Sequence, residues 1–125
     1  DPRVCDDVTL LPQAKVIRRV AWTETGYVSA MDTTALGLAA QAMGAGRQKK
    51  TDRLDYSVGF VLHSRIGDHV LPGLPMATLY ARTEAEADEA QAALRGAITL
   101  ADTPVKQPPL CYAIITKDGV TRFDA

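Results

Sequence analysis

Apolar and polar side chains alternate with the period of a β-strand in some segments of this sequence and with the period of an α-helix in others. Each such segment predicts one strand or one helix. Residues 15–22, KVIRRVAW, are rich in β-forming side chains, and Val16, Arg18 and Val20 would share one face of a strand. A short second strand is predicted at 27–30, after a glycine turn. Further strands are predicted at 54–63, 76–80, 110–116 and 120–123.

Two segments carry helical patterns. Residues 35–43 are almost entirely apolar, and the Asp32 carboxylate is placed to cap the first turn of a helix there. A helix that is apolar on most sides is expected to be buried, and Gly37 within it predicts a close backbone approach. A second helix is predicted at 83–100, with Thr83 as its N-cap and an apolar stripe at helical spacing.

The order of these elements is β-β-α-β-β-β-α-β with a final strand, which is an α+β pattern. Gly67-Asp68 is a hairpin signal and Pro72-Gly73 a second turn signal, so the strands are short and tightly connected. The length of 125 residues favours one domain. Residues 1–14 contain two prolines and three acids without periodicity and are predicted to be a linker, which leaves 15–125 as the domain.

Composition narrows the possible functions only slightly. The net charge is −1, so no overall field attracts nucleic acid or an anionic membrane. No apolar run reaches the roughly 18 residues of a membrane-spanning helix. The two cysteines, Cys5 and Cys111, are expected to be free thiols, although sequence alone does not decide whether they pair. No metal-ligand spacing of cysteine and histidine is present.

The most suggestive charged segment is GAGRQKKTDRLDYSVGF, residues 44–60. Its cations are Arg47, Lys49, Lys50 and Arg53. A phosphate cradle needs its glycines before a helix, where free amides converge, whereas Gly44 and Gly46 follow one. Gly44 is instead expected to end the helix in the left-handed conformation, with cations near the negative end of the dipole. An anion site and a nucleic-acid patch remain alternatives for this loop.

Other candidate chemistry is sparse. His63 and His69 flank the turn at Asp68 and form the one histidine-carboxylate combination that suggests an active site. The acidic face of the second predicted helix is the candidate for a metal, although exposed acids are ordinarily solvated. Asp6-Asp7 lies in the predicted linker, without the rigid scaffold that acid-base catalysis needs. We therefore assign no catalytic, cofactor-binding or metal-ligating residue.

One segment suggests a different class of protein. Residues 64–81, SRIGDHVLPGLPMATLYA, are similar to half of a biotinyl or lipoyl carrier domain. Such modules need a lysine on an exposed hairpin beyond this half-motif, but the next lysine is Lys106, in a proline-rich segment. A stand-alone binding module without an attachment lysine is therefore the alternative from another class.

Three motifs in a fixed order carry a stronger resemblance. GYVSAMDTTALGLAAQAMGAGR (26–47), DYSVGF (55–60) and GDHVLPGLPMATLYA (67–81) together resemble the C-terminal domain of thymidine and pyrimidine-nucleoside phosphorylases. The resemblance extends over residues 26–102, and residues 1–14 resemble the linker from the catalytic region. It implies a small hammerhead-like α+β domain, with a twisted, mostly antiparallel sheet or half-barrel and two main helices.

The resemblance also implies a function for the polypeptide of which this domain is part. Such enzymes are cytoplasmic homodimers of nucleoside salvage, glycosyltransferases that transfer the pentosyl group of a pyrimidine nucleoside to phosphate. Phosphate is a co-substrate, and no cofactor, nucleic acid or membrane is involved. No segment here matches the family's Lys-His-Ser-Thr-Gly-Gly type phosphate motif, so the chain alone is expected to be inactive. YVSAMDTTALG and DYSVGF favour the thymidine-specific type, with broad pyrimidine specificity as the alternative, and Arg47 is expected to hold its loop.

Overall fold

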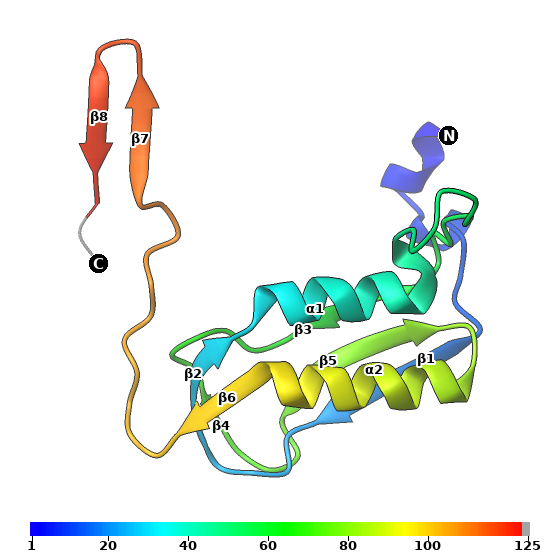
Figure 1. Cartoon of the computed structure of the whole chain (residues 1–125), viewed down its shortest axis with the longest axis horizontal. Coiled ribbons are helices and arrows are strands. Elements are labelled where there is room, and N and C mark those ends of the chain that lie inside the picture. Colours follow the sequence, from blue (N-terminus) through cyan, green and yellow to red (C-terminus); the bar gives the residue numbers. More distant parts are fainter. Residues whose placement is uncertain (124–125) are drawn as a thin grey trace.

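The first two strands form where the sequence predicts them, but they join different sheets. The computed structural model describes residues 1–123 (Figure 1). β1 (Val16–Ala21), β5 (Pro75–Ala81) and β3 (Gly59–Leu62) form an antiparallel sheet in the order β1-β5-β3. β5 is the central strand of this sheet, and its Leu79 side chain is completely buried.

The second sheet has the order β4-β2-β6 and is also antiparallel. It contains β4 (His69–Val70), β2 (Gly26–Met31) and β6 (Ile98–Ala101). The Gly67-Asp68 turn is therefore not a hairpin turn: β4 pairs with β2, and the turn carries the chain from one sheet to the other.

The strand β6 replaces the last turn of the predicted helix at 83–100. α2 (Glu84–Ala97) begins at its Thr83 cap, as predicted, but ends three residues early. Ile98 and Thr99 are β-branched residues, and pairing with β2 supplies their backbone with partners that a helix would have supplied locally. The edge of β2 thus decides the conformation of this segment.

The predicted strand at 54–63 is shorter than expected for a local reason. Only residues 59–62 are extended and paired. The Asp55 carboxylate accepts hydrogen bonds from the Ser57 amide at 2.9 Å and the Ser57 hydroxyl at 2.6 Å. This side-chain turn competes with strand pairing and keeps the preceding residues irregular.

The two helices lie side by side over the sheets (Figure 1). In α1 (Thr33–Ala40) the Asp32 carboxylate accepts a hydrogen bond from the Ala35 amide at 2.9 Å, as predicted. α1 continues into η3 (Gln41–Ala45), a π-helical turn in which Gly44 has φ 103°. A side chain is strained at this φ, so the prediction that Gly44 ends the helix is confirmed.

The expectation that the first helix is buried on most sides is wrong. Leu36, Ala39 and Met43 face the core, but Leu38 is 59% exposed. The predicted close approach at Gly37 is also not found, since a Cβ added there would meet no atom within 4 Å in the described residues. α1 therefore presents apolar surface that nothing in residues 1–123 covers.

The core lies between the helices and the inner faces of the two sheets. Its largest completely buried side chains are Met76, Leu79, Leu94 and Val28. The one tryptophan, Trp22, joins this cluster, and its indole N–H donates to the hydroxyl of buried Ser64 at 3.0 Å. Both sheets and α2 thus contribute to one core.

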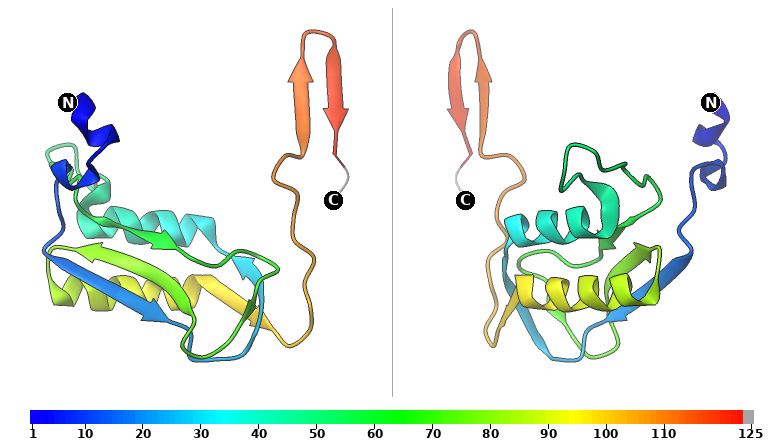
Figure 2. Two further views of the ribbon diagram at one scale, coloured as in Figure 1. Left: turned by 180° about the vertical axis from the view of Figure 1, so that it is seen from behind. Right: turned by 45° about the vertical axis from the view of Figure 1, so that its right-hand side comes forward.

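The two three-stranded sheets and the two helices together form what we call the body. The C-terminal part of the described chain extends away from it. Residues 102–109, which we call the tether, lead to residues 110–123, which we call the arm (Figures 1 and 2). The arm contains the hairpin of β7 (Ala113–Thr116) and β8 (Gly119–Arg122), as predicted, with a glycine at φ 134° after the turn. The hairpin pairs with no other strand of residues 1–123.

Residues 1–14 form two 3-10 turns, η1 (Pro2–Cys5) and η2 (Val8–Leu10), before the chain enters β1. Neither turn contains a buried residue. Helices and antiparallel sheets together confirm an α+β domain with two main helices, and no closed barrel is present within residues 1–123.

Candidate functional site

The basic loop after η3 is held by its polar side chains and its backbone. The Gln41 amide donates to the Arg47 carbonyl, and the Asp52 carboxylate accepts from the amides of Gln48 and Lys49 at 3.1 and 2.9 Å. The Gly44 carbonyl accepts from the Asp55 amide at 3.0 Å. The loop is therefore closed on itself by capping-type hydrogen bonds.

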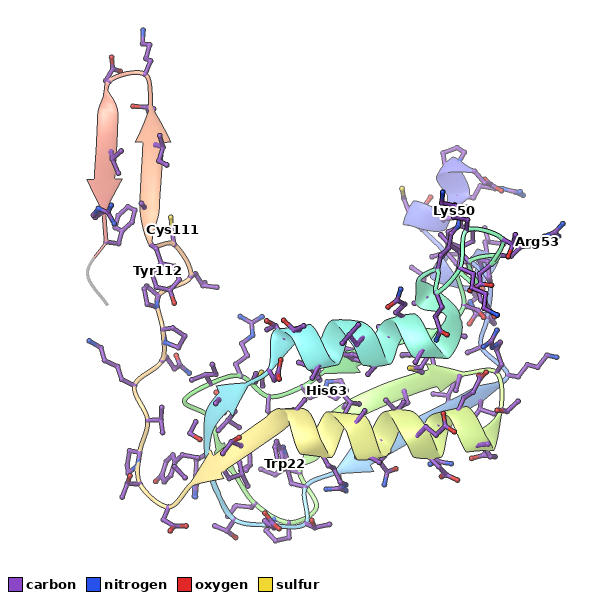
Figure 3. The ribbon with its side chains drawn as sticks, viewed as in Figure 1. Trp22, Lys50, Arg53, His63, Cys111 and Tyr112 are labelled. Atoms are coloured by element: carbon purple, nitrogen blue, oxygen red, sulfur yellow. The ribbon has the colours of Figure 1, made fainter. Side chains whose placement is uncertain are left out.

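The side chains of the four cations in the loop do not take part in this network, although the Arg47 carbonyl and the Lys49 amide do. Arg47, Lys49, Lys50 and Arg53 are exposed, and none forms an ion pair within residues 1–123. Figure 3 shows Lys50 and Arg53 on the outside of the loop. The expectation that the Arg47 side chain holds the loop is wrong, because Gln41 and Asp52 hold it instead.

Arg82 packs against the end of η3 and binds the first turn of α2, and it is not among the residues that the sequence pattern singles out. Its guanidinium donates to both carboxylate oxygens of Glu86, with Nε at 3.0 and 3.1 Å and an Nη at 2.6 Å. A Cβ added at Gly44 would lie 3.2 Å from the guanidinium carbon. An arginine four residues before a glutamate at a helix start was the available signal.

Electrostatics in this region follow from these hydrogen bonds. The hydrogen bond from Arg82 holds the pKa of Glu86 below its ordinary value. The hydrogen bond from the Ser57 hydroxyl is the main cause that lowers the pKa of Asp55. Both carboxylates are therefore stabilised in the ionised form, which suits a structural role and not a proton donor near neutral pH.

A polar pocket of about 400 Å³ lies between η3, the loop and Arg82. Its lining residues are Gln41, Ala42, Gly44, Gly46, Gln48, Asp52, Arg53 and Arg82. It is a poor anion site, because Glu86 already engages Arg82, a carboxylate lies in the lining, and the helix ends here with its negative dipole end. The geometry therefore favours a helix exit with a solvated loop.

The structure brings the histidine-carboxylate combination together at one open pocket of about 310 Å³, which His63, Asp68 and His69 help to line. His63 Nε2 lies 2.8 Å from the Thr78 hydroxyl, while His69 stacks on Tyr27 with ring centroids 4.5 Å apart. The Asp68 carboxylate accepts from the Arg65 amide at 2.8 Å and from the Gln107 side chain at 3.3 Å. Each group thus has its own structural partner, and no hydrogen bond among the described residues joins the three, so they share a pocket without the hydrogen-bonded contact that a nucleophile and its base need.

The acidic face of α2 serves as a docking surface for β1. Arg18 forms ion pairs with Glu84 and with Asp88, which joins the helix to the first strand. No group of three or more potential metal ligands is found in the described residues. An apolar groove of about 210 Å³ lies between the helices and is lined mainly by alanines and Met43.

The remaining candidates lie at the periphery. Cys5 and Cys111 are free and exposed, as expected. Lys106 is exposed in the tether, and Lys117 is exposed in the turn between β7 and β8. This second lysine occupies a hairpin tip, although its hairpin is not the one that follows the half-motif at 64–81.

No helix in the described part of the chain is long and apolar enough to cross a membrane.

Comparison with known protein families gives a match that covers most of the two sheets and both main helices, with β1 outside it. The model of the family described as the pyrimidine nucleoside phosphorylase C-terminal domain matches residues 27–101. This span begins in β2 and ends with β6, so it includes both main helices and the central strand of the first sheet. The match covers more than half of the sequence, and the chain therefore belongs to the family of pyrimidine nucleoside phosphorylase C-terminal domains.

Proposed function

We propose that this chain is the non-catalytic C-terminal domain of a thymidine phosphorylase, whose complete polypeptide converts thymidine and phosphate to thymine and 2-deoxyribose 1-phosphate. The observation that supports this is the family match over residues 27–101, which include both main helices and every strand of the two three-stranded sheets except β1. The polar side chains of that body mainly bind one another, as the pairs formed by Arg82 and by Arg18 illustrate. The domain supports the catalytic region, and chemistry takes place in the polypeptide that precedes it.

The preference for thymidine is part of the proposal and derives from the amino-acid sequences of two segments, YVSAMDTTALG and DYSVGF. A broader pyrimidine nucleoside phosphorylase is the alternative within the same class. The proposed enzyme is a cytoplasmic homodimer of nucleoside salvage, and it uses no cofactor apart from its co-substrate phosphate.

The test is phosphorolysis of thymidine and uridine by the purified 125-residue chain and by its parent polypeptide. We expect no release of free base from the chain alone, and release by the parent with thymidine preferred. Base release by the chain alone would contradict a non-catalytic domain. Equal rates for the two nucleosides in the parent would favour the broader enzyme.

A carrier module is the second candidate, and the position of Lys117 at a hairpin tip is the observation in its favour. The mass of the chain isolated from its own cells decides between the two. An added biotinyl or lipoyl group at this lysine would support the carrier, whereas an unmodified mass supports the phosphorylase domain.

A further inference from the structure

The arm carries apolar side chains on both faces of a two-stranded hairpin. Ile115 pairs with Val120 across the ladder, and they are 77% and 56% exposed. Adjacent residues of a strand point to opposite faces, so Ile114 lies on the other face. Tyr112 and Phe123 join that face, because the Phe123 amide bonds to the Tyr112 carbonyl at 2.9 Å, which continues the ladder beyond Ile114.

An arm of this kind needs a partner on each face. An isolated two-stranded hairpin is at best marginally stable in water, and strands that are apolar on both faces are typical of sheets covered on both sides. The tether also fixes the direction in which the arm leaves the body. A Cβ at Gly67 would lie 2.4 Å from Gln107 Cγ and 3.1 Å from the Val105 carbonyl, so the tether packs closely on this turn.

The arm, the exposed part of α1 and the N-terminal turns belong to one side of the molecule. In all three views of Figures 1 and 2, the arm and the N-terminal turns rise on the α1 side of the body, at opposite ends of that helix. All three carry exposed apolar side chains. These are Val8, Leu10 and Leu11 in the turns, Leu38 in α1, and Leu110, Tyr112, Ile114, Ile115, Val120 and Phe123 in the arm.

We propose that this side of the molecule is the interface with the polypeptide that precedes residue 1. That polypeptide packs on α1 and covers both faces of the arm. The family is a C-terminal domain by description, so the remainder of such a polypeptide precedes it and enters through η1, beside this surface. Covalent attachment gives that occupant a high effective concentration, which a second copy lacks. The inference rests on the proposed place of the chain in a phosphorylase polypeptide.

Hydrogen exchange followed by mass spectrometry tests the interface without any assay of catalysis. In the 125-residue chain we expect the amides of 113–122 to exchange at rates near those of an unfolded peptide, while β5 and α2 are protected. In the parent polypeptide the same arm amides should exchange about 100-fold more slowly. Arm exchange at the same rate in both proteins would overturn the proposal, whether or not the parent cleaves thymidine.

A variant pair identifies the occupant in the parent polypeptide. Ile115→Lys should abolish the protection of the arm and leave the protection of β5 unchanged, because the arm lies outside the core. Thr99→Lys, which adds the same charge at an exposed position of β6, should leave both unchanged. Arm protection that rises with concentration in the 125-residue chain would instead assign the surface to a second copy and overturn the assignment to the preceding polypeptide.

Discussion

Single side chains in this domain mostly satisfy the hydrogen bonds of other side chains or of the backbone. Trp22 and Ser64 are the clearest case, since both are buried and the indole N–H donates to the hydroxyl. Figure 3 shows Trp22 beside α2, inside the body. Within residues 1–123 no buried side-chain nitrogen or oxygen lacks a partner. Removal of one member of such a pair therefore has a predictable cost.

Ser64→Ala should lower the free energy of unfolding by about 1–2 kcal/mol, because it leaves the buried indole N–H without an acceptor. Urea denaturation followed by the fluorescence of Trp22, the one tryptophan, measures this directly. Ser29→Ala is the control, since its hydroxyl bonds to the Thr99 carbonyl at a site where water can replace it. Equal losses in the two variants would contradict the role of burial.

Replacing two glycines by alanine should change the free energy of unfolding in opposite directions. Gly67→Ala should destabilise the chain by about 1–2 kcal/mol, because alanine is strained at φ 96° and its Cβ would meet the tether. Gly37→Ala should stabilise it by about 0.5–1 kcal/mol, since the helical site is open and alanine loses less entropy. Denaturation midpoints compare the two, and limited proteolysis shows whether Gly67→Ala also releases the tether. Stabilisation by alanine at position 67 would contradict the packing described.

The elements depend on a few contacts between neighbours in space. The start of α2 is an example, because Arg82 joins the end of β5 to Glu86 in the first helical turn and lies under the exit of η3. The hydrogen bond lowers the pKa of Glu86 from its ordinary value of 4.5. A carboxyl whose pKa is lower in the folded state contributes stability above its unfolded pKa, and this contribution is lost as the pH falls through the folded pKa.

Glu86→Gln should therefore lower the free energy of unfolding by about 0.5 kcal/mol at pH 7, a modest value because the ion pair is partly exposed. The difference from the unmodified chain should shrink as the pH falls below 4.5, where Glu86 itself becomes protonated. Urea titrations at several pH values measure it. Glu89→Gln, at an exposed position of the same helix and with no ion pair in residues 1–123, is the control. A difference that grows in acid would refute the assignment to Glu86.

The molecule as a whole places its two cysteines at opposite ends. Cys5 closes η1, while Cys111 lies at the base of the arm (Figure 3), and both thiols are exposed. Both should react with a thiol reagent in the native chain without denaturant, and the mass without reductant should show no internal disulfide. A disulfide within one chain would require the arm to fold onto the N-terminal turns and would contradict the arrangement in Figure 1.

The sequence predicts the parts of the fold that depend on neighbours along the chain. The caps at Asp32 and Thr83, the helix end at Gly44 and the terminal hairpin are all confirmed, because each requires contacts over only a few residues. The family could also be predicted from the sequence, because its motifs are contiguous stretches in a fixed order. The interpretation of the basic loop as a helix exit rests on the same local rules.

Tertiary structure decided what local rules could not. Residues 98–100 belong to the predicted helix at 83–100, yet they become part of β6 because β2 offers them an edge. The apolar helix α1 is partly exposed, because burial depends on what the rest of the molecule brings to each face and not on the helix itself. The position of Arg82 beneath Gly44 likewise joins residues far apart in sequence. Local caps fix where the two helices begin, whereas the end of α2, the pairing of the strands and the exposed faces depend on contacts between distant segments.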